Sequence, residues 1–120
     1  IVRATIEAVA YQTHDLFEAM KHDGVRPKIV KVDGGMVMNN WFSQFLSDIV
    51  NVKVLRPKVQ ETTALGAAFM AGLQIGVYKS LKDISKNWHL DKKFSPKMKN
   101  KSRSMLIKGW EKAVKRALIN

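Results

Sequence analysis

The sequence contains no cysteine and only three prolines among its 120 residues. The absence of cysteine excludes a disulfide framework, thiolate metal ligands and a cysteine nucleophile, and it is compatible with a reducing compartment. No apolar run approaches the roughly 20 residues that a transmembrane helix requires. We therefore expect a cytoplasmic protein with no membrane partner.

Self-contained catalytic motifs are also missing. The sequence has no Walker A loop, no GxSxG elbow and no HExxH helix. Its three histidines, His14, His22 and His89, show no pair at a metal-ligand spacing. The sequence therefore predicts no metal ligand and does not contain a complete set of catalytic residues.

The formal net charge of +11 is concentrated in the last third of the sequence. Residues 1–78 carry eight basic and seven acidic side chains, whereas residues 79–120 carry thirteen basic and three acidic ones. Such a basic segment leaves a nucleic-acid-binding module open as an alternative function. The segment lacks regular aromatic interleaving, however, and this favours a solvated helix face.

The stretch KIVKVDGGMVMNN predicts a strand, a tight turn and the start of a helix, in that order. Its β-branched residues suit a buried strand over Lys28–Val32, which the pair Gly34 and Gly35 ends. Asn39 and Asn40 are favourable N-cap residues for the apolar helical pattern that follows. The turn therefore joins a strand to a helix.

A glycine turn at this place lets the backbone approach a phosphate or a nucleoside closely. The pattern thus favours an anionic or nucleotide ligand. A plain turn, in which the glycines only supply unusual backbone angles, stays open as the alternative. Asp33, at the end of the strand, either orders water around a metal-bound phosphate or caps the turn.

Periodicity and breakers predict helices at 1–20, 40–50 and 61–72, a strand at 52–55 that closes at Arg56-Pro57, and a last helix after residue 104. Two successive strand–helix units favour a parallel sheet. The helix at 61–72 is rich in small residues, including Gly66 and Ala67, which predicts close packing against a sheet or helix. Thr62 or Thr63 is the expected cap at its start.

Several long motifs, in one order, carry a family resemblance. They are KIVKVDGGMVMNN with FSQFLSDIV, then VLRPKVQETTALGAAFMAG, and finally GWEKAVKRA. Together they resemble the C-terminal part of the FGGY carbohydrate kinases, most closely the members that phosphorylate glycerol. The resemblance runs over essentially the whole sequence, and Ala4-Thr5-Ile6-Glu7 looks like the end of a family signature whose earlier part would precede Ile1.

The resemblance implies an α/β fold: part of an actin-like, ribonuclease-H-like ATPase domain with parallel βα units and flanking helices. Residues 1–78 would form a partial, nucleotide-binding ATPase subdomain. Residues 79–120 would form a basic helical extension packed on it. In this family the nucleotide lies in a cleft between two such domains.

The resemblance also implies which residues bind the nucleotide. The backbone contacts fall on Gly34 and Gly35, with Gly35 the stronger candidate, and the contact with adenine falls on Asn39. The implied cofactors are ATP and Mg²⁺, and the implied partners are glycerol, ATP or ADP, and the N-terminal part of the same polypeptide. Glycerol-binding residues, the catalytic base and the phosphate loops would lie in that N-terminal part.

We therefore expect a homo-oligomeric glycerol-phosphorylating enzyme of which this segment, inactive alone, supplies the adenosine side of the ATP site. Three alternatives remain. They are another FGGY sugar kinase, a noncatalytic nucleotide-binding scaffold, and a basic module that binds nucleic acid.

Overall fold

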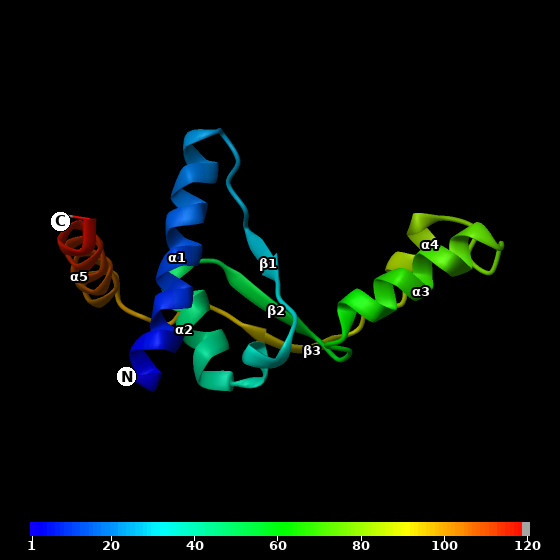
Figure 1. The fold of residues 1–120 in the computed structure, drawn as a ribbon, viewed down its shortest axis with the longest axis horizontal. Helices are drawn as coiled ribbons and strands as arrows, with labels where there is room; N and C mark the ends of the chain where they lie inside the picture. Colours follow the sequence, from blue (N-terminus) through cyan, green and yellow to red (C-terminus); the bar gives the residue numbers. More distant parts are fainter. Residues whose placement is uncertain (119–120) are drawn as a thin grey trace.

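The computed structural model describes residues 1–118, and Figure 1 shows their fold. The elements are, in chain order, α1 (Val2–His22), β1 (Ile29–Lys31), the 3₁₀ helix η1 (Gly35–Met38), α2 (Asn40–Val50), β2 (Lys53–Pro57), α3 (Thr62–Gln74), α4 (Leu81–Ser85), β3 (Leu90–Phe94) and α5 (Asn100–Leu118). The predicted helices at 1–20 and 40–50 correspond to α1 and α2. The last helix begins earlier than predicted, because its first turn is polar and carries no apolar periodicity.

The three strands form one sheet in the order β1–β2–β3. β1 and β2 are parallel, which confirms the prediction from successive strand–helix units, and β3 adds an antiparallel strand. β2 continues through Pro57, beyond the predicted end of the strand. The pairing of β2 with β3 shifts register between Arg56 and Pro57, where proline has no N–H to give to the ladder.

The core lies between α1, α2 and the sheet. Its buried apolar side chains are Ala10, Tyr11, Val37, Phe42, Phe45, Leu46, Ile49, Val50, Val54 and Phe94. They include Phe42, Phe45, Leu46 and Ile49, whose spacing of i, i+3, i+4 and i+7 predicts the apolar face of α2. The ring of Tyr11 meets Phe45 edge-on, and burial raises the pKa of the Tyr11 hydroxyl, with Glu7 adding to the rise and Arg3 opposing it.

The expectation of a buried strand at Lys28–Val32 is wrong for β1. Ile29 is 52% exposed and Val30 only half-buried. Among residues 1–118, β1 forms the edge of the sheet, and β2 is the neighbour to which it is hydrogen-bonded. Its apolar composition is that of an interior strand, but within residues 1–118 only one of its two edges is paired with a neighbouring strand.

α3 and α4 form an arm that extends away from the sheet and from α1 and α2 (Figure 1). Gly72 packs closely on the turn that follows α3, where an added Cβ would lie 2.9 Å from the ring of Tyr78. The predicted close packing against a sheet or another helix is not found at Gly66, which has open space around it, or at Ala67, which is exposed. The predicted threonine cap is also wrong, because Glu61 holds the N-cap position without a side-chain bond.

α5 lies at the other end of the molecule from the arm (Figure 1). Trp110 stacks on Tyr11 with 5.5 Å between ring centroids, and its Nε1 donates to Asp15 Oδ2 at 2.7 Å. Its basic residues Lys108 and Lys112 are exposed to solvent, as predicted. No helix within residues 1–118 is both long enough and apolar enough to cross a membrane.

Candidate nucleotide site

The glycine turn leaves the sheet at the carboxyl end of β1. Gly34 has φ 87° and ψ 172°, a conformation that residues with a Cβ rarely adopt. A Cβ added at Gly34 or Gly35 would meet no atom within 4 Å, so the turn borders open space. The structure places the short helix η1 between this turn and α2, an element that the sequence pattern did not reveal.

Asn39 occupies the N-cap of α2, as the sequence predicts. Its Oδ1 accepts hydrogen bonds from the backbone N–H groups of Trp41 at 2.9 Å and Phe42 at 3.3 Å. These bonds fix which end of the amide faces the helix. Asn39 is exposed, and its Nδ2 donates no hydrogen bond within residues 1–118. The amide N–H groups therefore remain available to an acceptor outside the described chain.

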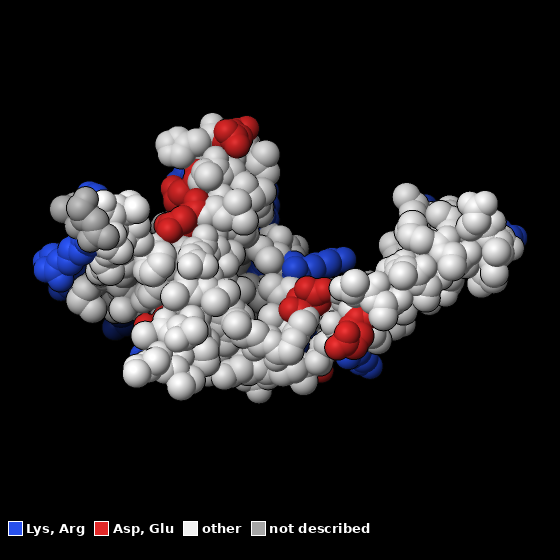
Figure 2. All heavy atoms as spheres, viewed as in Figure 1, with Lys and Arg blue, Asp and Glu red and all other residues white. Residues whose placement is uncertain are grey.

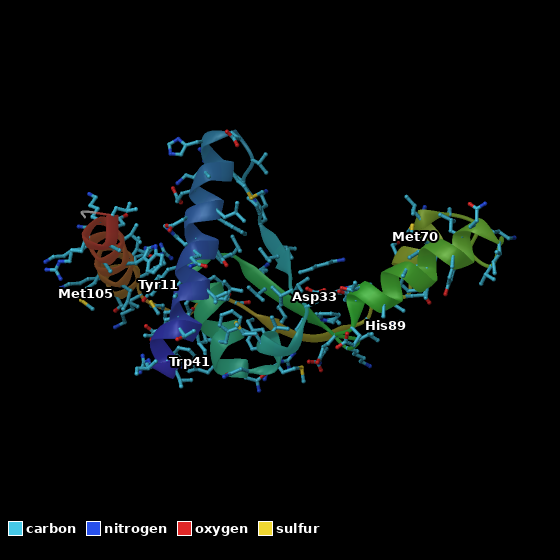
Figure 3. The ribbon with its side chains drawn as sticks, viewed as in Figure 1. Tyr11, Asp33, Trp41, Met70, His89 and Met105 are labelled. Carbon is cyan, nitrogen blue, oxygen red and sulfur yellow. The ribbon has the colours of Figure 1, made fainter. Side chains whose placement is uncertain are left out.

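Asp33 does not cap the glycine turn. Its carboxylate instead accepts a hydrogen bond from the hydroxyl of Thr62, which connects the end of β1 to the start of α3. Figure 3 shows Asp33 at the junction between the sheet and the arm. Within residues 1–118 no group of three or more His, Asp or Glu side chains is placed to hold a metal ion.

The candidate residues Gly34, Gly35 and Asn39 lie in one continuous segment, which forms an open wall rather than an enclosed pocket. The segment also exposes the apolar side chains of Met36 and Met38, which precede Asn39. A hollow of about 380 Å³ lies elsewhere, between α1, the turn after α2, and α5. An open wall is what one side of a cleft between two domains would present.

The sequence analysis did not identify Arg56, a buried side chain that is hydrogen-bonded to the backbone of this segment. Its guanidinium donates from Nη1 to the carbonyl oxygens of Val37 at 2.9 Å and Met38 at 3.1 Å. Its Nε donates to Asp91 Oδ2 at 2.7 Å. An arginine between apolar residues of a short strand was the available signal, because arginine is almost never fully buried without partners.

The far end of α2 is tied to residues that follow β3. The buried carboxylate of Asp48 accepts from the backbone N–H groups of Lys97 at 2.5 Å and Met98 at 3.1 Å. Gln44 Nε2 donates to the carbonyl oxygen of Ser95 at 2.9 Å. The helix that carries Asn39 is therefore held by a segment about fifty residues further along the chain.

Comparison with known proteins identifies the family to which this chain belongs. The model of the FGGY family of carbohydrate kinases, C-terminal domain, matches residues 1–75. Glycerol kinase 1 of Pseudomonas aeruginosa is 53% identical over 116 residues, and the glycerol kinase of Thermoanaerobacter pseudethanolicus is 55% identical over 119. These matches cover 97% and 98% of this chain and 24% of each relative. The chain thus spans about a quarter of the length of these relatives.

Solved structures agree. The crystal structure of Plasmodium falciparum glycerol kinase with ADP matches with a TM-score of 0.83 and 39% identity, over 100% of this chain and 24% of that one. The xylulose kinase of Lactobacillus acidophilus matches at 0.79 and 23% identity, over 97% and 24%, and shows the fold alone. The predicted α/β class, with part of an actin-like ATPase fold, is confirmed. This chain belongs to the FGGY family of carbohydrate kinases.

Proposed function

We propose that this chain is the C-terminal, nucleotide-binding part of an ATP-dependent glycerol kinase. The whole protein would transfer the γ-phosphoryl group of ATP to a glycerol hydroxyl, giving glycerol 3-phosphate. One observation carries the proposal: all of this chain matches one quarter of a glycerol kinase whose structure contains ADP. The curated relatives named glycerol kinase support the same substrate.

In this proposal the open wall formed by Gly34, Gly35 and Asn39 is the adenosine side of the ATP site. The absence of side chains at the two glycines lets a nucleotide lie against the backbone. The free Nδ2 of Asn39 is a donor for a ring nitrogen of adenine. The open space around the turn and the unused amide N–H groups support these assignments.

The rest of the site belongs to the part of the kinase that this chain does not span. Phosphoryl transfer depends chiefly on positioning and on charge stabilisation. We assign the catalytic base, the glycerol-binding residues and the phosphate loops to that part, because the family resemblance maps none of them onto this chain. The chain alone would then be inactive, and the whole enzyme would work as a cytoplasmic homo-oligomer.

The deciding experiment measures ADP production by the full-length protein with glycerol, xylulose, gluconate or no acceptor. We expect turnover that depends on glycerol, with little turnover on xylulose or gluconate. Turnover with xylulose or gluconate would keep the family and replace the substrate. ATP binding without turnover on any acceptor would instead favour a noncatalytic scaffold.

A further inference from the structure

We propose that Arg56 is a positioning residue for the nucleotide turn, and that Asp91 orients Arg56 for this role. The inference rests on the proposed function of the turn. Neither residue belongs to the candidate wall itself, and both would act through the backbone of η1.

The contacts of Arg56 surround it on three sides. Two bonds from Nη1 reach the carbonyl oxygens of Val37 and Met38, at the end of η1. One bond from Nε reaches Asp91, and the guanidinium carbon lies 5.6 Å from the ring centre of the buried Phe94. The side chain is only 7% exposed. A charge removed from water to this extent must be paired and hydrogen-bonded.

The direction of these bonds matters for the ligand. Carbonyl groups at the end of a helix point along its axis, away from its N-terminus. Arg56 therefore holds η1 at the end opposite to Gly35 and leaves the glycine side open. Ser43 adds a second anchor, because its Oγ donates to the carbonyl oxygen of Val37 at 2.8 Å. Together they fix the position of the wall without occupying it.

An irregularity in β3 aims Asp91 at Arg56. Arg56 pairs with Lys92, but the next residue, Pro57, pairs with Leu90, so Asp91 is the extra residue of a bulge. In a regular ladder Asp91 would point to the face opposite to Lys92 and Arg56. A bulge changes the direction of a side chain, and the resulting ion pair is 2.7 Å long. This bulge lies beyond residues 1–75, which the family model matches.

The test uses the full-length protein with the variants Arg56→Met, Arg56→Lys, Asp91→Asn and the double variant Arg56→Met with Asp91→Asn. The matched controls are Lys86→Met and Asp83→Asn, which break an exposed ion pair on α4. Equilibrium ADP affinity, KM for ATP, KM for glycerol and circular dichroism are measured for each.

We expect Arg56→Met to weaken ADP binding and raise KM for ATP by about tenfold, since small misplacements of a binding group are costly. KM for glycerol should stay within about twofold, a split that general loss of structure would not produce. Arg56→Lys should be intermediate. Asp91→Asn, at a side chain 39% exposed, should weaken ADP binding by about threefold and keep the fold.

The double variant should be no worse than Arg56→Met, because Asp91 acts through Arg56. Additive effects of the two changes, or ADP affinity unchanged in folded Asp91→Asn, would overturn the inference while the kinase assignment stands. If Arg56→Met does not fold, Asp91→Asn and Arg56→Lys decide. Turnover on a sugar in place of glycerol would overturn only the proposed substrate. Absence of ADP binding by the wild type would overturn both the proposed function and the inference about Arg56.

Discussion

Gly34 and Gly35 are neighbours, but the reasons for a glycine at the two positions differ. The backbone angles of Gly34, φ 87° and ψ 172°, would strain any residue with a Cβ by about 1–3 kcal/mol. Gly35 is not among the glycines with positive φ, and a Cβ there would meet nothing within 4 Å. The chain itself therefore tolerates a side chain at Gly35, and a requirement for glycine at this position would come from the ligand.

We expect Gly35→Val in the full-length protein to raise KM for ATP by about tenfold or more, because a branched side chain would enter the space of the nucleotide. KM for glycerol should change much less. Steady-state kinetics with each substrate varied in turn would measure both. Gly109→Val, which adds the same side chain to open space on α5, is the control. An unchanged KM for ATP would refute the assignment of Gly35.

At the scale of single residues, what could be predicted depends on distance along the sequence. Asn39 caps a helix whose first N–H groups are two and three residues away, so a local pattern is enough to find the cap. Arg56 bonds to residues 18, 19 and 35 positions away. No local pattern encodes such partners, and only the folded chain brings them together.

At the scale of elements, Asn39 at the start of α2 has one structural role and one proposed binding role. The Oδ1 atom stabilises the helix start, whereas Nδ2 is the proposed contact with adenine. Aspartate is about as good an N-cap as asparagine, but it lacks the amide donor. Substitution can therefore separate the structural purpose from the binding one.

For Asn39→Asp we expect unchanged stability with weaker ATP binding, since the cap is kept and the donor is lost. For Asn39→Ala we expect weaker binding together with a loss of about 1 kcal/mol in the free energy of unfolding. Denaturant unfolding and ADP titration of the full-length protein would measure the two effects. Wild-type ADP affinity in Asn39→Asp would rule out the adenine contact.

The elements that were predicted least well are those with unmatched apolar surface. β1 has the composition of an interior strand, and α3 contains no charged residue, yet both are largely uncovered within residues 1–118. A hydrophobic pattern reports that a face needs cover, but it does not name the segment that provides it. The helix η1 was missed for another reason: four residues are too few to show a period.

At the scale of the whole molecule, the longest axis extends 54 Å, with α5 near one end and the arm at the other (Figure 1). Figure 2 shows lysine and arginine side chains over the end that carries α5, whereas the visible surface of the arm is almost uncharged. The division into a nucleotide-binding part at 1–78 and a basic extension at 79–120 remains a prediction. β3 nevertheless lies within the same sheet as β1 and β2.

We expect the basic face of α5 to give only non-specific affinity for nucleic acid, with a dissociation constant no tighter than about 1 μM at physiological salt. The measurement is fluorescence anisotropy of labelled duplex DNA and RNA with the full-length protein. Replacing Lys108, Lys112 and Lys115 by glutamine should leave kinase kinetics unchanged. Tighter binding that falls steeply with salt and disappears in the triple variant would revive the nucleic-acid alternative.

The separation of Arg56 and Asp91 along the sequence also sets an order of events during protein synthesis. Arg56 leaves the ribosome 35 residues before its carboxylate partner, a delay of roughly 2–7 s at translation rates of about 5–20 residues per second. During that interval the guanidinium of Arg56 lacks the counter-charge that Asp91 supplies in the folded chain. On our proposal, a nascent kinase would therefore acquire a fully ordered ATP wall only after β3 has emerged.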